Sequence, residues 1–379
     1  MLENLSNDIS KLENKIFFDP NHVYYFNAQR SKELILLLQN RYNNFDDKNV
    51  YDIFSESLGI NDIKNITLNT SKWAGHLIAF VDTSDHKYVY RQNYGLPTPE
   101  SYMLFEKDIV DQYKPLGIDS VDILASGSKS WFEWQIMEVL PDKNLKEVPC
   151  TQAEYDNLSL QIGEIIAKQY SLPHEWWGRI FKDENNVLRW HKKTHHDHLT
   201  AYLWYDLDVM WLSQIVDESS IALLKNHLAG DKTQKMFTHT KSYLINNDLP
   251  EHNVTVNKDK TKITAVYDWE NAVIFDPICE LWSLPTRVSQ YPKKEKLKEW
   301  FWSYLNKTNV WDNIDLTSFD EKIAVYFLRT MLWKMPLAIK GNKLLTRHVD
   351  LLEETLVDNK LDNKIKINNE AKQILTWNR

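Results

Sequence analysis

The segment that runs from Asn246 to Pro277, NNDLPEHNVTVNKDKTKITAVYDWENAVIFDP, constrains the fold of this chain more than any other. Two strand-like runs, VTVN and ITAVY, flank the polar turn KDKTK, a pattern typical of a β-hairpin. Asn253 lies just before the first strand and Asp268 directly follows the second, so a tight hairpin places both at the same end. Asp248 lies five residues before Asn253 in the same loop. The sequence therefore predicts that three oxygen-bearing side chains converge on one small volume.

This set of side chains suits phosphoryl transfer that depends on a metal ion. Mg²⁺ prefers a few protein oxygens together with phosphate and water oxygens, and Asn253 and Asp268 are the predicted ligands. A phosphoryl-transfer site also needs a carboxylate that orients the attacking hydroxyl, and Asp248 is the predicted base. Each residue taken alone also fits ordinary turn chemistry, because Asn and Asp are common in loops for backbone reasons. The joint spacing favours the catalytic interpretation.

The same residues resemble the catalytic and metal loops of the aminoglycoside phosphotransferase and choline kinase superfamily. The pattern of that superfamily is His-x-Asp-x-x-x-x-Asn, a hairpin, Asp-Trp-Glu, and then Asp-Pro eight residues after the Asp of that triplet. The chain supplies the acidic and amide residues of this pattern at the same steps, as Asp248, Asn253, Asp268 and Asp276. It departs from the pattern at Asn246, which replaces the motif histidine, and at Glu280, which stands where an Asp is usual.

The resemblance implies an α+β class and the bilobal fold of protein kinases, with a small antiparallel-sheet N-lobe and a larger helical C-lobe. Hydrophobic periodicity along the chain indicates the same outline, with a helical N-terminal extension ahead of the N-lobe. We predict three regions. Residues 1–65 form the helical extension, residues 66–140 form the N-lobe with the nucleotide-binding sheet and one helix, and residues 141–379 form the helical C-lobe with the catalytic and metal loops.

Strand and helix signals fill in these regions. In the N-lobe, HLIAFV and KYVYRQ flank the turn DTSDH as a hairpin, a helix is expected over 99–116, and further strands over 121–124 and 132–140. In the C-lobe, apart from the hairpin described above, we expect mainly helices, at 154–170, 197–230, 235–246, 293–306, 319–338 and 347–358.

The N-lobe is expected to hold the nucleotide. The resemblance places Arg91 on the α- and β-phosphates, with Lys87 on the same face of the strand as the fallback. Glu106 falls on the inward face of the following helix, where a buried carboxylate needs a partner, and Arg91 is the predicted one. Three further residues resemble the hinge that lies alongside the adenine, namely Met137, Glu138 and Leu140.

Three other groups of residues suggest sites of their own, although each has a commoner structural explanation. Four histidines lie close together in the sequence, at His191, His195, His196 and His198. They could bind zinc, although a run of this kind is more often a polar loop that enters a helix. Asp206 and Asp208 could contact a cationic substrate or lie on a helix surface. Tryptophans of the C-lobe could form a cation–π pocket for a quaternary amine, although core packing is commoner for Trp176, Trp177, Trp190, Trp204, Trp211, Trp282, Trp300 and Trp302.

Composition argues against several classes of function. The formal net charge of −8 gives no global electrostatic support for nucleic-acid binding. The two cysteines, Cys150 and Cys279, can form neither a disulfide framework nor a cysteine metal site. Apolar runs fall short of the ~18 residues expected of a membrane span, and the first residues lack the pattern of a signal peptide. We therefore expect a cytoplasmic protein without a membrane partner.

These observations predict a phosphotransferase that uses ATP or GTP with Mg²⁺ and phosphorylates a hydroxyl of a small cationic molecule, such as an aminoglycoside, an amino alcohol or a related antibiotic. One alternative is a catalytically impaired pseudokinase that binds a nucleotide or a protein. Three features favour it: Asn246, the N-terminal extension, and a phosphate-loop region in which Gly75 is the only glycine. Another is a kinase-like enzyme for a larger acceptor, such as an antibiotic with a peptide or nucleoside core, or a protein. The joint presence of Asp248, Asn253 and Asp268 argues against the pseudokinase. The identity of the acceptor, the choice between ATP and GTP, and the oligomeric state stay open.

Overall fold

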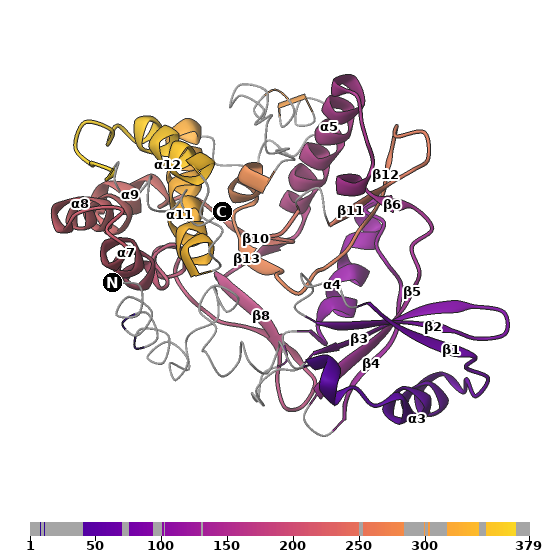
Figure 1. Cartoon of the computed structure of the whole chain (residues 1–379). Helices are drawn as coiled ribbons and strands as arrows, with labels where there is room; N and C mark the ends of the chain where they lie inside the picture. The colour runs from indigo at the N-terminus through magenta and orange to yellow at the C-terminus, as the bar shows by residue number, and fades with distance from the viewer. Residues whose placement is uncertain are drawn as a thin grey trace.

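The structure is a computed structural model, and it describes residues 8, 11, 41–69, 76–93, 101, 103–129, 132–249, 253–283, 299, 302–303, 317–340 and 346–368. It has a smaller lobe built on one sheet and a larger lobe that is mostly helical (Figure 1). The predicted α+β arrangement of a small antiparallel-sheet lobe followed by a larger helical lobe is thus confirmed. The helices expected within the first 40 residues and at 293–306 lie almost entirely outside the described residues.

The sheet of the smaller lobe has five antiparallel strands in the order β1-β2-β3-β5-β4. These strands are β1 (Asn65–Asn69), β2 (Leu77–Asp82), β3 (Lys87–Asn93), β4 (Ile123–Lys129) and β5 (Phe132–Glu138). The predicted hairpin is present, because β2 and β3 pair in register from Leu77 opposite Gln92 to Asp82 opposite Lys87. The strand expected at 121–124 lies further along the chain, as β4, where it pairs with β5.

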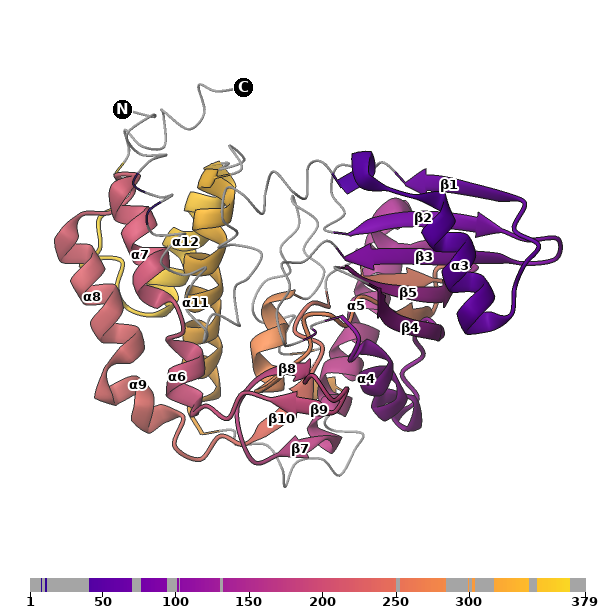
Figure 2. The same cartoon turned by 90° about the horizontal axis from the view of Figure 1, so that it is seen from below.

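The two faces of this sheet have different neighbours. Helix α3 (Asp47–Leu58) covers one face (Figure 2), and its buried residues share a core with strand residues that include Leu77 and Tyr90. Successive side chains of a strand point to opposite faces, so Arg91 points the other way, toward α4 (Glu106–Tyr113). Helix α4 is shorter than the predicted span of 99–116 and continues as a 3₁₀ turn, η2 (Lys114–Leu116).

Helices of the larger lobe gather at the end of the molecule that lies away from this sheet (Figure 2). They are α6 (His195–Leu199), α7 (Leu203–Leu212), α8 (Glu218–Ala229), α9 (Asp231–Met236), α11 (Phe319–Lys340) and α12 (Thr346–Asp358). The helical structure expected over 197–230 is present and is divided among three of these helices, α6, α7 and α8. Tyr202 and Gln214 adopt left-handed backbone conformations, with φ of 55° and 57°, at the two breaks.

Helix α5 (Gln152–Lys168) belongs to the larger lobe, because its buried apolar residues share a core with those of α11, and it matches the predicted helix at 154–170. Its start is fixed by a capping box, in which the Thr151 hydroxyl accepts the Glu154 backbone N–H and the Glu154 carboxylate accepts that of Thr151. The 3₁₀ turns η3 (Leu145–Glu147) and η4 (Gln169–Ser171) flank this helix.

The larger lobe also contains a five-stranded sheet that sequence patterns did not predict. Its strands run in the order β7-β10-β13-β8-β9 and are β7 (Pro173–His174), β8 (Gly178–Lys182), β9 (Leu188–Trp190), β10 (Ser242–Ile245) and β13 (Val273–Phe275). The helix expected over 235–246 is therefore wrong, because α9 ends at Met236 and β10 follows. All four residues of β10 are buried, and a short apolar run of this kind cannot be distinguished from buried helix by periodicity.

The hairpin predicted from the catalytic segment is present. It consists of β11 (Val254–Val256) and β12 (Ile263–Val266), which pair in an antiparallel manner from Val254 opposite Val266. A third strand, β6 (Lys143–Asn144), completes a small sheet on the other side of β11.

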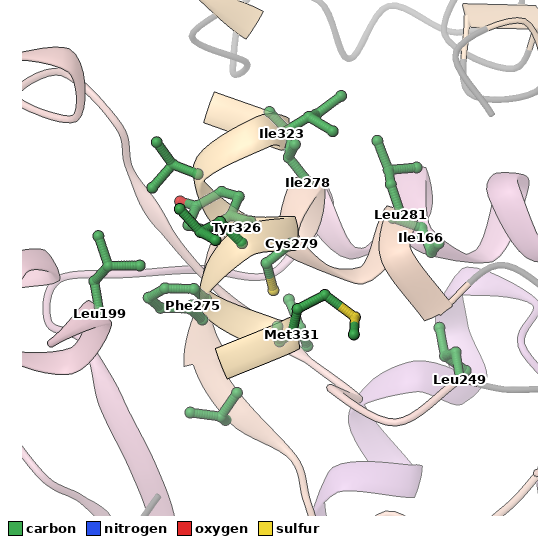
Figure 3. Close-up of a cluster of buried hydrophobic side chains, with 14 of the residues drawn as sticks. Ile166, Leu199, Leu249, Phe275, Ile278, Cys279, Leu281, Ile323, Tyr326 and Met331 are labelled. Atoms are coloured by element: carbon green, nitrogen blue, oxygen red, sulfur yellow. The ribbon is translucent and has the colours of Figure 1, made fainter. Parts of the chain in front are cut away.

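One apolar core fills the larger lobe. Figure 3 shows Ile278 and Cys279 of the 3₁₀ segment η5 (Pro277–Ser283) beside Tyr326 and Met331 of α11, and all four side chains are buried. Within the described part of the chain, every helix is too short or too polar to cross a membrane.

Gly178, at the start of β8, is a position where any side chain is expected to destabilise the fold. Its φ is 145°, and a Cβ atom built there would lie 2.0 Å from the carbonyl oxygen of His191. Gly178→Ala should therefore lower the free energy of unfolding by about 1–3 kcal/mol, measured by urea denaturation. Gly59→Ala is a matched control that changes a glycine with a φ of 70° but with open space around the built Cβ atom. An equal loss in both variants would contradict a role for the His191 contact.

Candidate active site

The catalytic loop follows β10, and hydrogen bonds from residues of this loop and from Asn271 hold Asp248 in place. The Oδ1 atom of Asn246 accepts the backbone N–H of Asp248 at 2.9 Å, so Asn246 caps the loop at the position of the motif histidine. The side-chain amide of Asn253 donates to the backbone carbonyl of Asp248 at 2.9 Å. The amide of Asn271 donates to Oδ2 of Asp248 at 3.3 Å. Asp248 and Asn253 are thus in direct contact.

The hairpin β11–β12 brings Asp268 to the same place. The backbone N–H of Tyr267 donates to the carbonyl of Asn253 at 3.0 Å, which joins the residue before the first strand to the residue after the second. Asp268 and Asn247 both have a left-handed backbone conformation with φ of 63°. Strained non-glycine residues persist where the surrounding structure holds them, and they are frequent at functional sites. The structure therefore brings Asp248, Asn253 and Asp268 together.

Arg91 on β3 connects these loops to the smaller lobe. It is almost fully buried, and its Nη1 atom lies 2.8 Å from Oε1 of Glu106, so the pairing expected between these two residues is present. Its Nη2 atom lies 2.7 Å from Glu270 and 3.3 Å from Asp268. Glu106 also accepts the backbone N–H of Trp269 at 3.3 Å. Arg91 is consequently shared between helix α4 and the metal loop.

Two residues at this site were not assigned a role from the sequence. Glu270 is part of the Asp-Trp-Glu triplet, but nothing in the spacing indicates that its carboxylate turns back onto Arg91. His76, just before β2, has its Nε2 atom 2.8 Å from Nη2 of Arg91 and in contact with the carboxylate of Glu270. Its sequence neighbourhood gives no signal of this contact, which depends on how the lobes meet.

The donor atoms at the site fit a divalent cation. Among the described residues, the one group of three acidic, cysteine or histidine side chains with ligand atoms within 4.8 Å of one another is Glu106, Asp268 and Glu270. Asp268 belongs to this group and is joined to Asn253 through the hairpin. Carboxylate and amide oxygens are the ligands that Mg²⁺ uses together with phosphate oxygens. Arg91 already offsets part of the negative charge of this group, through Glu106, Asp268 and Glu270.

Burial and neighbouring charges shift the acid–base behaviour of these carboxyls. Burial raises the pKa of Asp248 to about 6, although Lys334 of α11 pulls it down and Glu270 pushes it up. Burial and then Glu270 raise the pKa of Asp268 to about 6, against the pull of Arg91. Because 33% of the Asp268 side chain is exposed, solvent weakens these effects. The pKa of Glu270 is lowered despite burial, because His76 and Arg91 favour its ionised form.

A small apolar cluster lies beside Arg91 and is separate from the cores of both lobes. Its buried members are Val121, Ile123 and Met137, and Val89, Leu140 and Tyr267 pack against them. Val89 lies two residues before Arg91 on the same face of β3 and opposite Met137 on β5. The structure thus brings Met137 and Leu140 together.

Other residues proposed from the sequence lie elsewhere. The side chain of Glu138 is turned toward His86, with 2.7 Å between its Oε2 and the Nε2 of the histidine, and away from this cluster. Lys87, at the start of β3, is exposed, and its Nζ atom lies 3.0 Å from a carboxylate oxygen of Asp82 on β2. The fallback role of Lys87 on the phosphates is therefore not supported, whereas Arg91 lies among the carboxylates of the site.

The alternative sites in the larger lobe are not supported. His195 and His198 are buried rather than solvated, and His195 stacks on Phe237 and Phe275. None of the four histidines belongs to a group suited to a metal ion within the part of the chain that the structure describes. Asp206 does not lie on a helix surface, because it is fully buried and its Oδ2 lies 2.7 Å from Nη1 of Arg329.

The tryptophans whose side chains the structure describes divide between packing and exposure. Trp177 is buried in the core of the larger lobe. Three partly buried tryptophans pack against this core, namely Trp190, Trp204 and Trp302. Trp176 and Trp211 are 43% and 48% exposed. The side chains of Trp282 and Trp300 are outside the described residues.

Known proteins share this sequence pattern and this fold. A sequence model described as the phosphotransferase enzyme family matches residues 70–299. A comparison with curated protein sequences gives no match. A candidate aminoglycoside phosphotransferase from Ralstonia eutropha is 13% identical, with a TM-score of 0.58 over 85% of this chain and 100% of that chain.

Two further structures have the same fold. A point mutant of aminoglycoside 2′-phosphotransferase-IIIa, in complex with GDP, is 14% identical with a TM-score of 0.53 over 84% of this chain and 97% of that chain. Choline kinase LicA from Streptococcus pneumoniae is 13% identical with a TM-score of 0.50 over 82% and 99%. Because the family match spans more than half of the chain, the protein is a phosphotransferase that belongs to the phosphotransferase enzyme family and has its bilobal, protein-kinase-like fold.

Proposed function

We propose that this protein is a small-molecule kinase that transfers the γ-phosphoryl group of ATP or GTP, bound with Mg²⁺, to a hydroxyl of its acceptor. The observation that carries the proposal is the convergence of Asp248, Asn253 and Asp268, with Arg91 in contact with Asp268. Phosphoryl transfer depends mainly on positioning and on electrostatic stabilisation, and these are the groups that supply both.

Each residue has a distinct role in this proposal. Asp248 orients the acceptor hydroxyl and accepts its proton as the oxygen attacks the γ-phosphorus. Asn253 and Asp268 would hold the metal ion, which would neutralise phosphate charge and help to orient the phosphates. Arg91, fixed by Glu106, contributes a buried positive charge to the α- and β-phosphates. The bond from the γ-phosphorus to the bridging oxygen breaks, and the nucleoside diphosphate leaves.

The apolar cluster around Met137 supports a position for the nucleotide base. Val89 and Arg91 occupy the same face of β3, so a base that packs on Val89 and Met137 would direct its phosphates toward Arg91 and Asp268. The aminoglycoside 2′-phosphotransferase with the same fold is described as a GDP complex. Met137 and Leu140 therefore stay candidate base contacts, and Glu138 would contribute only through its backbone.

The acceptor we propose is a small hydroxylated amine, such as an aminoglycoside, an amino alcohol or a related antibiotic. The names of the proteins with this fold, two aminoglycoside phosphotransferases and a choline kinase, support this range. We also retain as proposals the boundaries near residues 65 and 140 and a cytoplasmic location.

The test is a screen for phosphoryl transfer. Purified protein is incubated with Mg²⁺, with ATP or GTP, and with a panel of aminoglycosides, choline and other amino alcohols, and products are followed by mass spectrometry. The expected result is an acceptor heavier by one phosphoryl group, formed only with Mg²⁺ and with one donor preferred. Tight Mg–nucleotide binding without transfer to any hydroxyl would favour the pseudokinase alternative.

Asp268→Ala should weaken binding of the Mg–nucleotide complex by about 10- to 100-fold, because it removes a carboxylate ligand of the metal ion. Isothermal titration calorimetry with a non-hydrolysable analogue measures the effect. Asp259→Ala is the matched control, because Asp259 is exposed in the turn at the other end of the same hairpin. Equal affinities of the Asp268→Ala variant and the wild type would show that the metal assignment is wrong.

A further inference from the structure

A cluster of buried polar side chains lies directly behind the catalytic loop. Gln169, the first residue of η4, is fully buried. Its Oε1 atom accepts the backbone N–H of Asn246 at 2.8 Å, and its Nε2 atom donates to the carboxylate of Glu280. Glu280, also fully buried, uses its other oxygen to accept the backbone N–H of Asn247.

These contacts fix the backbone on the N-terminal side of Asp248. Gln169 holds the N–H of Asn246, Glu280 holds that of Asn247, and the side chain of Asn246 holds that of Asp248. Three consecutive amides are therefore bound by side chains. Asn247 lies in the middle of this run with a φ of 63°, a conformation that needs external support in a residue other than glycine.

The cluster also reaches the helix that holds Arg91. The hydroxyl of Tyr113, at the end of α4, lies 2.8 Å from Oε1 of Gln169 and 2.8 Å from the carbonyl oxygen of Leu244 on β10. Glu106, at the start of the same helix, binds Arg91. One short helix thus contacts both the nucleotide side and the catalytic-loop side of the site.

We propose that Gln169 is a positioning residue for Asp248, and that with Glu280 it provides the rigidity that this loop needs where Asn246 replaces the motif histidine. Gln169 is too far along the chain from the loop to be identified by spacing, and it contacts no reacting atom. The inference rests on the proposed function, because it takes Asp248 to be the base.

The hydrogen-bond pattern permits a swap that separates positioning from packing. In Glu280→Gln, one amide oxygen must replace two carboxylate oxygens that accept from Gln169 and from the backbone of Asn247, so one bond is lost. In Gln169→Glu, two buried carboxylates face each other. The double variant Q169E/E280Q restores the bond between residues 169 and 280 and their bonds to the backbone amides of Asn246 and Asn247, with the same net charge and nearly the same volume. It gives up the 3.4 Å bond from the Gln169 amide to the carbonyl oxygen of Ile166.

The experiment measures kcat, the Mg–nucleotide affinity and amide hydrogen exchange of the peptide that contains residues 244–249. Each single variant should lower kcat by about 10- to 100-fold, because a small displacement of a catalytic group has effects of this size. The affinity for the Mg–nucleotide complex should stay within about twofold, and the loop amides should lose protection. The double variant should regain most of the kcat and of the protection.

Tyr113→Phe covers the case in which a single variant fails to fold. It removes only the hydroxyl beside Gln169 and keeps the ring that packs 4.4 Å from Trp269, and it should lower kcat severalfold with unchanged nucleotide affinity. Folded single variants with wild-type kcat and loop protection, or a double variant that recovers neither, would overturn the proposal. A wild type that transfers no phosphoryl group while its single variants lose loop protection would contradict the proposed function but support the restraint of the loop by Gln169.

Discussion

Asp248→Ala is expected to lower the rate of phosphoryl transfer by about 10²- to 10⁴-fold, the range typical of a lost general base. In the proposed function, Asp248 accepts the proton of the acceptor hydroxyl, whereas Asn253, Asp268 and Arg91 bind the Mg–nucleotide complex. The affinity for that complex should therefore stay within a few fold of the wild type. Single-turnover measurements at saturating donor and acceptor give the rate, and calorimetry gives the affinity.

Asp248→Asn provides the matched comparison. It keeps the shape of the side chain and leaves the backbone contacts with Asn246 and Asn253 in place, but it removes the group that takes the proton. We expect a loss similar to that of the alanine variant. Transfer at a rate near that of the wild type in either variant would eliminate Asp248 as the base, and a parallel loss of nucleotide affinity would instead indicate a role in metal binding.

Asp206→Ala is expected to produce the largest loss of stability, about 3–5 kcal/mol, because it leaves the charge of Arg329 buried without its carboxylate. Both side chains are almost fully buried, and Nη1 of Arg329 lies 2.7 Å from Oδ2 of Asp206. The guanidinium also donates to the carbonyl oxygens of Leu199 at 2.9 Å and Ala201 at 2.7 Å. The ion pair therefore joins α7, which carries Asp206, to α11, which carries Arg329, and the guanidinium also binds the last residue of α6, Leu199.

Urea denaturation followed by circular dichroism measures this effect, because the midpoint falls in proportion to the free energy that is lost. Asp208→Ala is a control in the same helix, since Asp208 is partly exposed. A double variant that replaces Asp206 by leucine and Arg329 by methionine should be more stable than Asp206→Ala, because no charge is left buried. A loss below about 1 kcal/mol in Asp206→Ala would contradict the importance of this pair.

The convergence of the proposed catalytic residues could be predicted from the sequence because it is local. Asp248, Asn253 and Asp268 lie within one segment of 21 residues in which a single hairpin determines their relative positions. The pairing of Arg91 with Glu106 was also within reach, since a carboxylate on an inward helix face requires a partner.

The contacts that sequence patterns did not indicate depend on how distant segments pack. His76 and Glu270 meet at Arg91 although they are 194 residues apart, and Gln169 meets Glu280 across 111 residues. No periodicity in either segment specifies such a contact. The same holds for β10. Its short buried run is predicted to be helical from the sequence, but it forms a strand because it pairs with β13, a distant segment of the chain.

The position of Asp206 shows a different limit of sequence reasoning. A charged residue on a helix is usually exposed, and Asp206 was therefore expected on a helix surface or against a substrate. The charge is instead buried because Arg329, 123 residues later, supplies a partner. Composition and spacing contain no trace of this pair.

The most direct test of Mg²⁺-dependent nucleotide binding is the midpoint of thermal unfolding with ATP, GTP and their non-hydrolysable analogues, each with and without Mg²⁺. A ligand that binds only the folded state raises this midpoint by mass action. We expect at least one nucleotide to raise the midpoint of the wild type only when Mg²⁺ is present, and we expect this rise to be lost in Asp268→Ala. A well-folded wild type whose midpoint does not change with either nucleotide would contradict the proposed nucleotide-dependent kinase activity and direct attention to protein partners.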